Sequence, residues 1–94
     1  GPAYVYYFMK NMIEAAITLG FNESEAELLV WQTFVGAMQL HNKNNFSCDE
    51  WIKRVSSKGG TTEAAVKVFE SQQLGNAIQD GIIAAFQRAE ELGK

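Results

Sequence analysis

The sequence is poor in cysteine and has no long apolar run, and both absences bear on where the protein works. A single cysteine, Cys48, cannot form a disulfide within the chain, which fits a reducing compartment. No apolar stretch is long enough to span a bilayer. The apolar first segment also lacks the basic start and cleavage pattern of a signal peptide. We therefore expect a cytoplasmic protein.

Basic residues are scarce as well. Lys and Arg number 8 against 11 Asp and Glu, which gives a net charge of −3. Nucleic acids and anionic membranes are both bound through basic patches. The one histidine, His41, has no second histidine or cysteine–histidine pair beside it that would build a zinc site. We expect no nucleic acid, no membrane and no metal as partners.

Proline is nearly absent, and the long segments are rich in residues that favour helix. The only proline, Pro2, stands where a first helix would begin, and apolar residues then recur at helical spacing as far as Leu19. Gly20 follows in the position of a left-handed C-terminal cap. The sequence therefore predicts a first helix from Pro2 to Leu19.

Two pairs with capping-box spacing mark the next helix starts. Asn22 and Glu25 open a second helix, which we expect to end near His41 because residues 42–45 are polar and typical of a loop. Ser47 and Glu50 open a short third helix that reaches residue 55.

Two adjacent glycines interrupt the chain before the last helices. A fourth helix is expected to start at Thr61 or Thr62 and to break near Gln73, and a last one covers residues 77–89 and frays at Gly93. No segment has the alternating pattern of a strand. We predict one all-α domain over residues 1–94, a bundle of four to five helices.

The apolar faces of these helices exceed what one small chain can cover. The first helix is apolar on most sides, and the second carries a wide apolar stripe. Left exposed, that surface would be larger than is usual for a soluble monomer. A two-fold dimer with a shared core is the simplest solution, and a monomeric bundle with the first helix at its centre is the alternative.

Residues 55–62 form the segment whose residue types most clearly indicate a binding site. A Gly-Gly pair followed by two threonines and a helix can bind an anion, because the first N–H groups of a helix lack intrahelical partners and the helix dipole favours negative charge there. The glycines allow close approach, and Thr61 or Thr62 can add a hydroxyl. The alternative is an ordinary helix start in which a threonine is only the N-cap.

The run VSSKGGTTEAAVKVFE, residues 55–70, resembles the signature of the pyrroline-5-carboxylate reductases. That signature has a hydrophobic residue, two small hydroxylated residues, Gly-Gly-x-Thr and then a helix. The opening Gly1-Pro2-Ala3-Tyr4 is similar to the start of the family's C-terminal domain. The second long helix is similar too, through Ala26, Gln32, Thr33, Gly36 and Ala37. The resemblance covers essentially all 94 residues.

The resemblance implies a specific reaction and assembly. The family reduces 1-pyrroline-5-carboxylate to L-proline with NADPH or NADH, a step of proline biosynthesis, and the nicotinamide lies in an N-terminal Rossmann domain. The helical C-terminal domain interlocks with its twin in a homodimer, and some members form larger assemblies of dimers. Since the resemblance is to the family's C-terminal domain and the chain contains no dinucleotide fingerprint, we expect it to be that domain without its cofactor domain. Alone it should be inactive, since hydride transfer needs the cofactor.

The same resemblance implies roles for six residues. The backbone of Gly59, Gly60 and Thr61 would hold the substrate carboxylate, and Val55 and Ser57 would line the pocket. The Thr62 hydroxyl would bond to the ring nitrogen and is the implied proton donor. A threonine hydroxyl is a poor acid, since efficient general acids have a pKa near the working pH. We therefore expect Thr62 to orient the ring or to relay a proton from water.

Two positions depart from the family pattern. Lys58 stands where proline is usual, and its charge either assists substrate binding or points to solvent. Gln73 stands where many members have a glycine. Two other functions remain open: a helical dimerisation module without a catalytic role, and a related dehydrogenase for another small carboxylate substrate.

Overall fold

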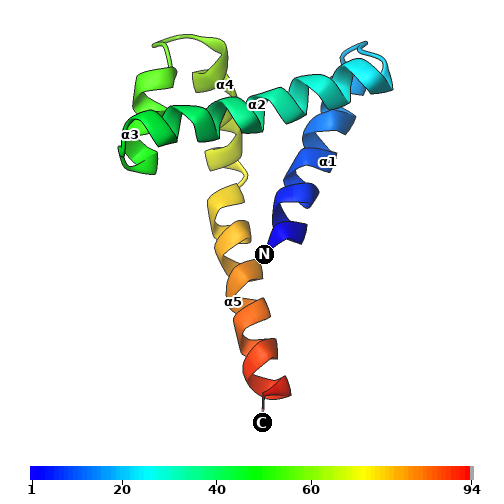
Figure 1. Ribbon diagram of the computed structural model, residues 1–94, viewed down its shortest axis with the longest axis vertical. Coiled ribbons are helices and arrows are strands. Elements are labelled where there is room, and N and C mark those ends of the chain that lie inside the picture. Colours follow the sequence, from blue (N-terminus) through cyan, green and yellow to red (C-terminus); the bar gives the residue numbers. More distant parts are fainter. Residues whose placement is uncertain (94) are drawn as a thin grey trace. The chain divides into compact units, whose positions relative to one another are not determined.

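The computed structural model describes residues 1–93, which form five helices and no strand (Figure 1). The helices are α1 (Pro2–Thr18), α2 (Glu23–Lys43), α3 (Cys48–Val55), α4 (Thr61–Ser71) and α5 (Leu74–Leu92). The predicted all-α class is confirmed. The chain divides into two compact units, one with α1 and α2 and one with α3, α4 and α5. The prediction of a single domain over residues 1–94 stays a prediction.

The end of α1 is closed by the glycine that the sequence marked. Gly20 has φ +111°, a conformation that glycine adopts without the steric cost paid by other residues. The Phe21 N–H donates to the Ala16 carbonyl at 3.2 Å, and the Gly20 N–H donates to the Ile17 carbonyl at 3.0 Å. This pair of bonds is the Schellman motif, so the predicted cap is confirmed.

The start of α2 is confirmed and its end is corrected. Asn22 is the N-cap, and both bonds of its capping box with Glu25 are present. The helix continues past His41 to Lys43, and the Asn44 N–H still donates to the Leu40 carbonyl at 3.2 Å. The expected stop near His41 was wrong because residues 42 and 43 are polar but are neither glycine nor proline, so nothing in their backbone ends a helix.

The helices α1 and α2 pack against each other around a small core. Its buried side chains are Met9 from α1 and Ala26 and Val30 from α2. Nearby, Tyr6 and Trp31 meet edge to face with ring centroids 6.2 Å apart, a favourable geometry for aromatic pairs. Met9 is the only buried residue of α1, which argues against the alternative of a monomeric bundle centred on the first helix.

Large apolar side chains remain uncovered on both units. In the first unit Tyr7 and Leu19 are 65% and 79% exposed, and in the second unit Phe86 and Leu92 are 65% and 70% exposed. No side chain of α3, α4 or α5 is buried within this chain. A large apolar surface is therefore left uncovered by the described residues.

In the second unit, α4 and α5 are consecutive helices that contact each other. The break between them lies at Gln72 and Gln73, as predicted, and α5 begins at Leu74 rather than near Ala77. Gln73 has the left-handed conformation, with φ 56° and ψ 38°. Within residues 1–93 no helix combines the length and apolar character needed to cross a membrane.

Candidate functional site

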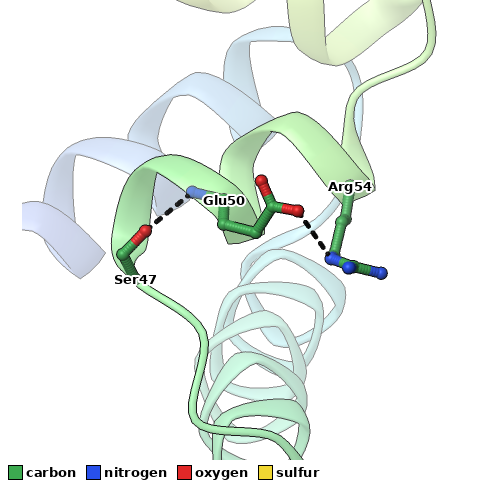
Figure 2. Close-up of polar contacts among 3 residues, drawn as sticks. All are labelled: Ser47, Glu50 and Arg54. Atoms are coloured by element: carbon green, nitrogen blue, oxygen red, sulfur yellow. Dashed lines mark hydrogen bonds and ion pairs between the residues drawn. The ribbon is translucent and has the colours of Figure 1, made fainter.

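The candidate segment begins at the end of α3, whose start is shown in Figure 2. Ser47 is the N-cap, and its hydroxyl accepts the Glu50 N–H at 3.2 Å. The predicted capping box is only half present, because the Glu50 carboxylate pairs with Arg54 Nε at 3.1 Å, one turn further along. This short helix ends at Val55, the first predicted site residue.

A tight turn over residues 57–60 follows α3. The Gly60 N–H donates to the Ser57 carbonyl at 2.9 Å and closes the turn. Gly59, its third residue, has φ +74°, whereas Lys58, its second, is not among the positive-φ residues. This combination defines a type II turn, which requires a residue that tolerates positive φ at its third position. Glycine is therefore favoured at position 59, because other residues adopt this positive φ at a steric cost.

The first turn of α4 starts without a side-chain cap. The N-cap is Gly60, which has extended backbone angles, and Thr61 and Thr62 are the first two helical residues. The alternative in which a threonine is the N-cap is therefore wrong. The first helical bond runs from the Ala64 N–H to the Gly60 carbonyl, at 3.2 Å.

Three amides are consequently left open at this end of α4. The N–H groups of Thr61, Thr62 and Glu63 have no hydrogen-bond partner within residues 1–93. Unpaired N–H groups at a helix N-terminus, together with the helix dipole, favour an anion in front of them. The arrangement is suited to a carboxylate.

The hydroxyls of the same two threonines are also available. Elsewhere in the molecule Thr18 and Thr33 donate their hydroxyls to the backbone carbonyl four residues earlier, at 3.0 and 2.8 Å. Thr61 and Thr62 lie at the beginning of their helix, where no helical carbonyl precedes them, and they are exposed. Neither hydroxyl has a hydrogen-bond partner among the described residues. Both are free to bond to a ligand.

The two glycine amides are already used inside the chain. Gly60 donates to Ser57, and the Gly59 N–H donates to Glu63 Oε1 at 3.1 Å. Of the three amides expected to hold a carboxylate, only that of Thr61 is open in this geometry. The contacts of Gly59 and Gly60 with a ligand stay predictions. The role of Glu63 was not predicted from the sequence, although a glutamate three residues after an N-cap has the capping-box spacing.

The two residues expected to line a pocket are on the surface. Val55 is 54% exposed, and Ser57 is exposed in the turn. Between them, Ser56 has a hydroxyl oxygen that is buried and without a hydrogen-bond partner within the described chain. Buried hydroxyls are usually hydrogen-bonded, so Ser56 is a second residue of the segment that the sequence analysis did not single out. The lining role of Val55 and Ser57 stays a prediction.

Residues 1–93 contain no Rossmann-type dinucleotide-binding unit. Such a unit needs a strand, a glycine-rich turn and a helix in succession, and these residues contain helices only. They also hold no group of three or more side chains suited to a metal ion.

Comparison with known proteins places the whole chain in one family. The family model described as pyrroline-5-carboxylate reductase dimerisation matches residues 1–92. Pyrroline-5-carboxylate reductases from Pseudomonas aeruginosa and Vibrio alginolyticus are 36% and 38% identical, over 100% and 99% of this chain. These matches cover 34% and 35% of the two relatives, so the chain spans about a third of their length.

Two solved structures have the same fold over 100% of this chain. The pyrroline-5-carboxylate reductase from Coxiella burnetii matches with a TM-score of 0.91 and 41% identity, over 35% of its own chain. The Plasmodium falciparum pyrroline carboxylate reductase, solved with NADP bound, matches with a TM-score of 0.94 and 26% identity, over 36% of its own chain.

Proposed function

Because this chain belongs to the pyrroline-5-carboxylate reductase family and matches its dimerisation region, we propose that it is the dimerisation and substrate-binding part of an enzyme that reduces 1-pyrroline-5-carboxylate to L-proline. The observation that carries the proposal is the open N-terminus of α4, with its unpaired amides beside two free threonine hydroxyls. The substrate has one carboxylate and one ring nitrogen, so it needs an anion site next to a hydroxyl.

The carboxylate would bind in front of α4. The amides of Thr61 and Thr62 would donate to its oxygens, and the helix dipole would add to the attraction. Hydrogen bonds to a charged group contribute about 1.5–3 kcal/mol each, more than bonds between neutral groups. Carboxylate binding through Gly59 or Gly60 would require their present bonds to open.

Thr62 would act on the ring nitrogen. A reduced nicotinamide, when bound, supplies the hydride that the ring carbon accepts, and electron density then moves to the nitrogen. A hydroxyl that donates to this nitrogen stabilises the transition state. Because threonine is a weak acid, Thr62 would orient the ring and pass on a proton from water rather than ionise itself.

A second copy of this chain is the partner we propose for the exposed apolar faces of both units. The family model is named for dimerisation, and side chains such as Tyr7 and Phe86 are left uncovered. Val55 and Ser57 would become pocket walls when the partner covers them. Larger assemblies of dimers are compatible with the same surfaces.

The cofactor, NADPH or NADH, would be held outside this chain. The described residues contain no dinucleotide-binding unit, and the relatives are about three times as long. We propose the cytoplasm as the compartment, which the single free Cys48 fits.

The experiment uses the full-length enzyme that contains this chain. Oxidation of NAD(P)H is followed with 1-pyrroline-5-carboxylate for the unmodified protein and for Thr62→Ala. We expect kcat to fall by up to about 100-fold, at or below the low end for general acid–base groups. Thr62→Ser should recover most of the rate, because it restores the hydroxyl.

Each other result has a definite meaning. If the unmodified enzyme binds NAD(P)H but does not reduce this substrate, the site serves another small carboxylate and Lys58 becomes the first residue to test. If the protein binds no cofactor and only dimerises, it is an interaction module. If the Thr62→Ala enzyme reduces the substrate at the unmodified rate, the proposed reaction is supported but the proposed role of Thr62 is wrong.

A further inference from the structure

Glu63 connects the turn over residues 57–60 to the helix that follows it. One carboxylate oxygen, Oε1, accepts the Gly59 N–H at 3.1 Å and also lies 3.5 Å from Lys67 Nζ. The Glu63 side chain is 36% exposed, against 76% for Lys67. The carboxylate is therefore held between the turn and the second turn of α4.

Gly59 has little else to hold it in place. A Cβ added at Gly59 would meet nothing within 4 Å, so the space where a side chain would lie is open. Glycine also has more backbone freedom than any other residue. One hydrogen bond, from Gly60 to Ser57, closes the turn itself. Two bonds join the turn to α4: the Ala64 N–H donates to the Gly60 carbonyl at 3.2 Å, and the Gly59 N–H donates to Glu63 Oε1, which makes Glu63 the side chain that ties the turn to the helix.

This bond also differs from the one that an ordinary capping box contains. In an ordinary capping box the acidic residue at the third helical position accepts the N–H of the N-cap itself. Here the N-cap is Gly60, and Glu63 accepts instead from the residue before it. The carboxylate thus occupies the Gly59 amide, while the amides of Thr61 and Thr62 have no partner within residues 1–93 because Gly60 has no side chain to accept from the first turn.

We infer that Glu63 is a positioning residue of the substrate-carboxylate site. It locks the turn so that an incoming carboxylate meets the α4 amides, next to the Thr62 hydroxyl, and not the Gly59 amide. This inference rests on the proposed function, since it concerns the same site. The contact matters for its geometry and not for its charge, so an uncharged acceptor of the same length is an adequate substitute.

The test compares three variants of the full-length enzyme in the same NAD(P)H assay. Glu63→Ala removes the acceptor. Glu63→Asp keeps the charge but is one methylene too short to reach Gly59. Glu63→Gln loses the charge and keeps the acceptor oxygen. Glu70→Ala, on the same helix and at an exposed position with no recorded side-chain bond, is the control.

We expect Glu63→Ala and Glu63→Asp to raise KM for 1-pyrroline-5-carboxylate by about two- to tenfold, the effect of one ordinary hydrogen bond. In both variants kcat should change by less than about twofold, because the Thr62 hydroxyl is intact. Glu63→Gln should return KM most of the way to the unmodified value, and Glu70→Ala should match that value. Such a KM-specific effect with rescue by glutamine would not arise from a loss of stability alone.

Three outcomes overturn the inference. If KM is unchanged in Glu63→Ala and Glu63→Asp while the unmodified enzyme turns over, Glu63 does not position the site and the proposed function is unaffected. If Glu63→Gln and Glu63→Ala lower KM equally, Glu63 acts only through charge repulsion. If the unmodified enzyme does not reduce this substrate, the proposed function fails and the inference fails with it. Should Glu63→Ala not fold, the contrast between Glu63→Asp and Glu63→Gln decides.

Discussion

The helices α2 and α4 both carry glutamate at their third position, yet the hydrogen bonds of their first turns differ. At α2, Asn22 Oδ1 accepts the Glu25 N–H at 2.9 Å, and Glu25 Oε1 accepts the Asn22 N–H at 3.0 Å. At α4, Gly60 has no side chain to offer, and Glu63 bonds to the residue before it. At the start of α2, side chains satisfy amides of the first turn, whereas at the start of α4 the first three helical amides have no partner within residues 1–93.

This difference comes from one residue, the N-cap, which is asparagine at α2 and glycine at α4, where we propose that the substrate carboxylate binds. A side chain at the N-cap would satisfy one of the orphan amides and compete with any ligand for it. Glycine at the same place preserves the helix, because it is tolerated there at a cost of only a few tenths of a kcal/mol relative to the best caps. The open end of α4 therefore costs the protein little stability.

The largest expected effect comes from making α4 resemble α2 through Gly60→Ser. The serine hydroxyl would accept an amide of the first turn, and the new Cβ would lie 3.1 Å from the Ser57 carbonyl oxygen, so the turn must shift slightly. We expect KM for 1-pyrroline-5-carboxylate to rise by about 10- to 100-fold, the effect of losing one charge-assisted hydrogen bond. Steady-state kinetics of the full-length enzyme measure this, and an unchanged KM would show that the amides do not bind the substrate.

The two positive-φ glycines provide a matched pair for the next effect. Gly20→Ala and Gly59→Ala each force a side chain into the left-handed region and should each lower the free energy of unfolding by about 1–2 kcal/mol. Gly20 precedes the capped start of α2, so its variant should keep KM. Gly59→Ala should raise KM as well. Urea unfolding at fixed protein concentration and the NAD(P)H assay measure the two properties, and the comparison fails if both variants change KM equally.

Removal of the side-chain cap of α2 should lower the stability of the protein and leave its kinetic constants unchanged. Asn22→Ala removes the side-chain cap and leaves the Glu25 amide without its partner, which should cost about 1 kcal/mol of unfolding free energy. The kinetic constants should stay at the unmodified values, because Asn22 and the candidate segment over residues 55–62 belong to different compact units. A change in KM in this variant would contradict the assignment of α2's start as purely structural.

The smallest expected effect is a stabilisation of the turn that precedes α4. Lys58 occupies the second position of the type II turn, where proline is favoured. Lys58→Pro should therefore raise the unfolding free energy by about 0.4–1 kcal/mol through a lower entropy of the unfolded chain. Chemical denaturation measures the gain. KM should change by less than about twofold if the Lys58 charge points to solvent, and a larger rise would assign it to substrate binding.

Most of the fold was predictable because its signals are local. Pro2, Gly20 and Asn22 act through their own backbone or through bonds to residues within a few positions, and the structure has each where the sequence predicted it. The end of α2 was not predictable from polarity, since a polar residue such as Lys43 continues a helix as well as it makes a loop. The spacing of apolar residues also does not locate a helix boundary to within one residue. For this reason α5 begins at Leu74 and not near residue 77, as the sequence predicted.

The candidate segment was found from the glycines and threonines, but its hydrogen bonds were not. The sequence indicates that Gly60 and Thr61 lie at a helix start, and it leaves open which of them is the cap. That choice depends on the turn before the helix, which Gly59 sets through its positive φ. The pairing of Glu50 with Arg54 and of Glu63 with Gly59 likewise depends on side-chain rotamers, which a pattern of residue types does not specify.

The turn before α4 is built entirely from short-range bonds, and this has a consequence for how the protein assembles. Its bonds join residues three or four positions apart, namely 57 with 60, 59 with 63 and 60 with 64. Contacts this local form within microseconds, whereas the pairing of two chains is concentration-dependent and takes milliseconds or longer. On the dimerisation proposed above, the backbone bonds that position the α4 amides lie within one chain and do not need the second copy. Activity lost on dilution should return as quickly as the chains re-associate, with no slower step in which the site refolds.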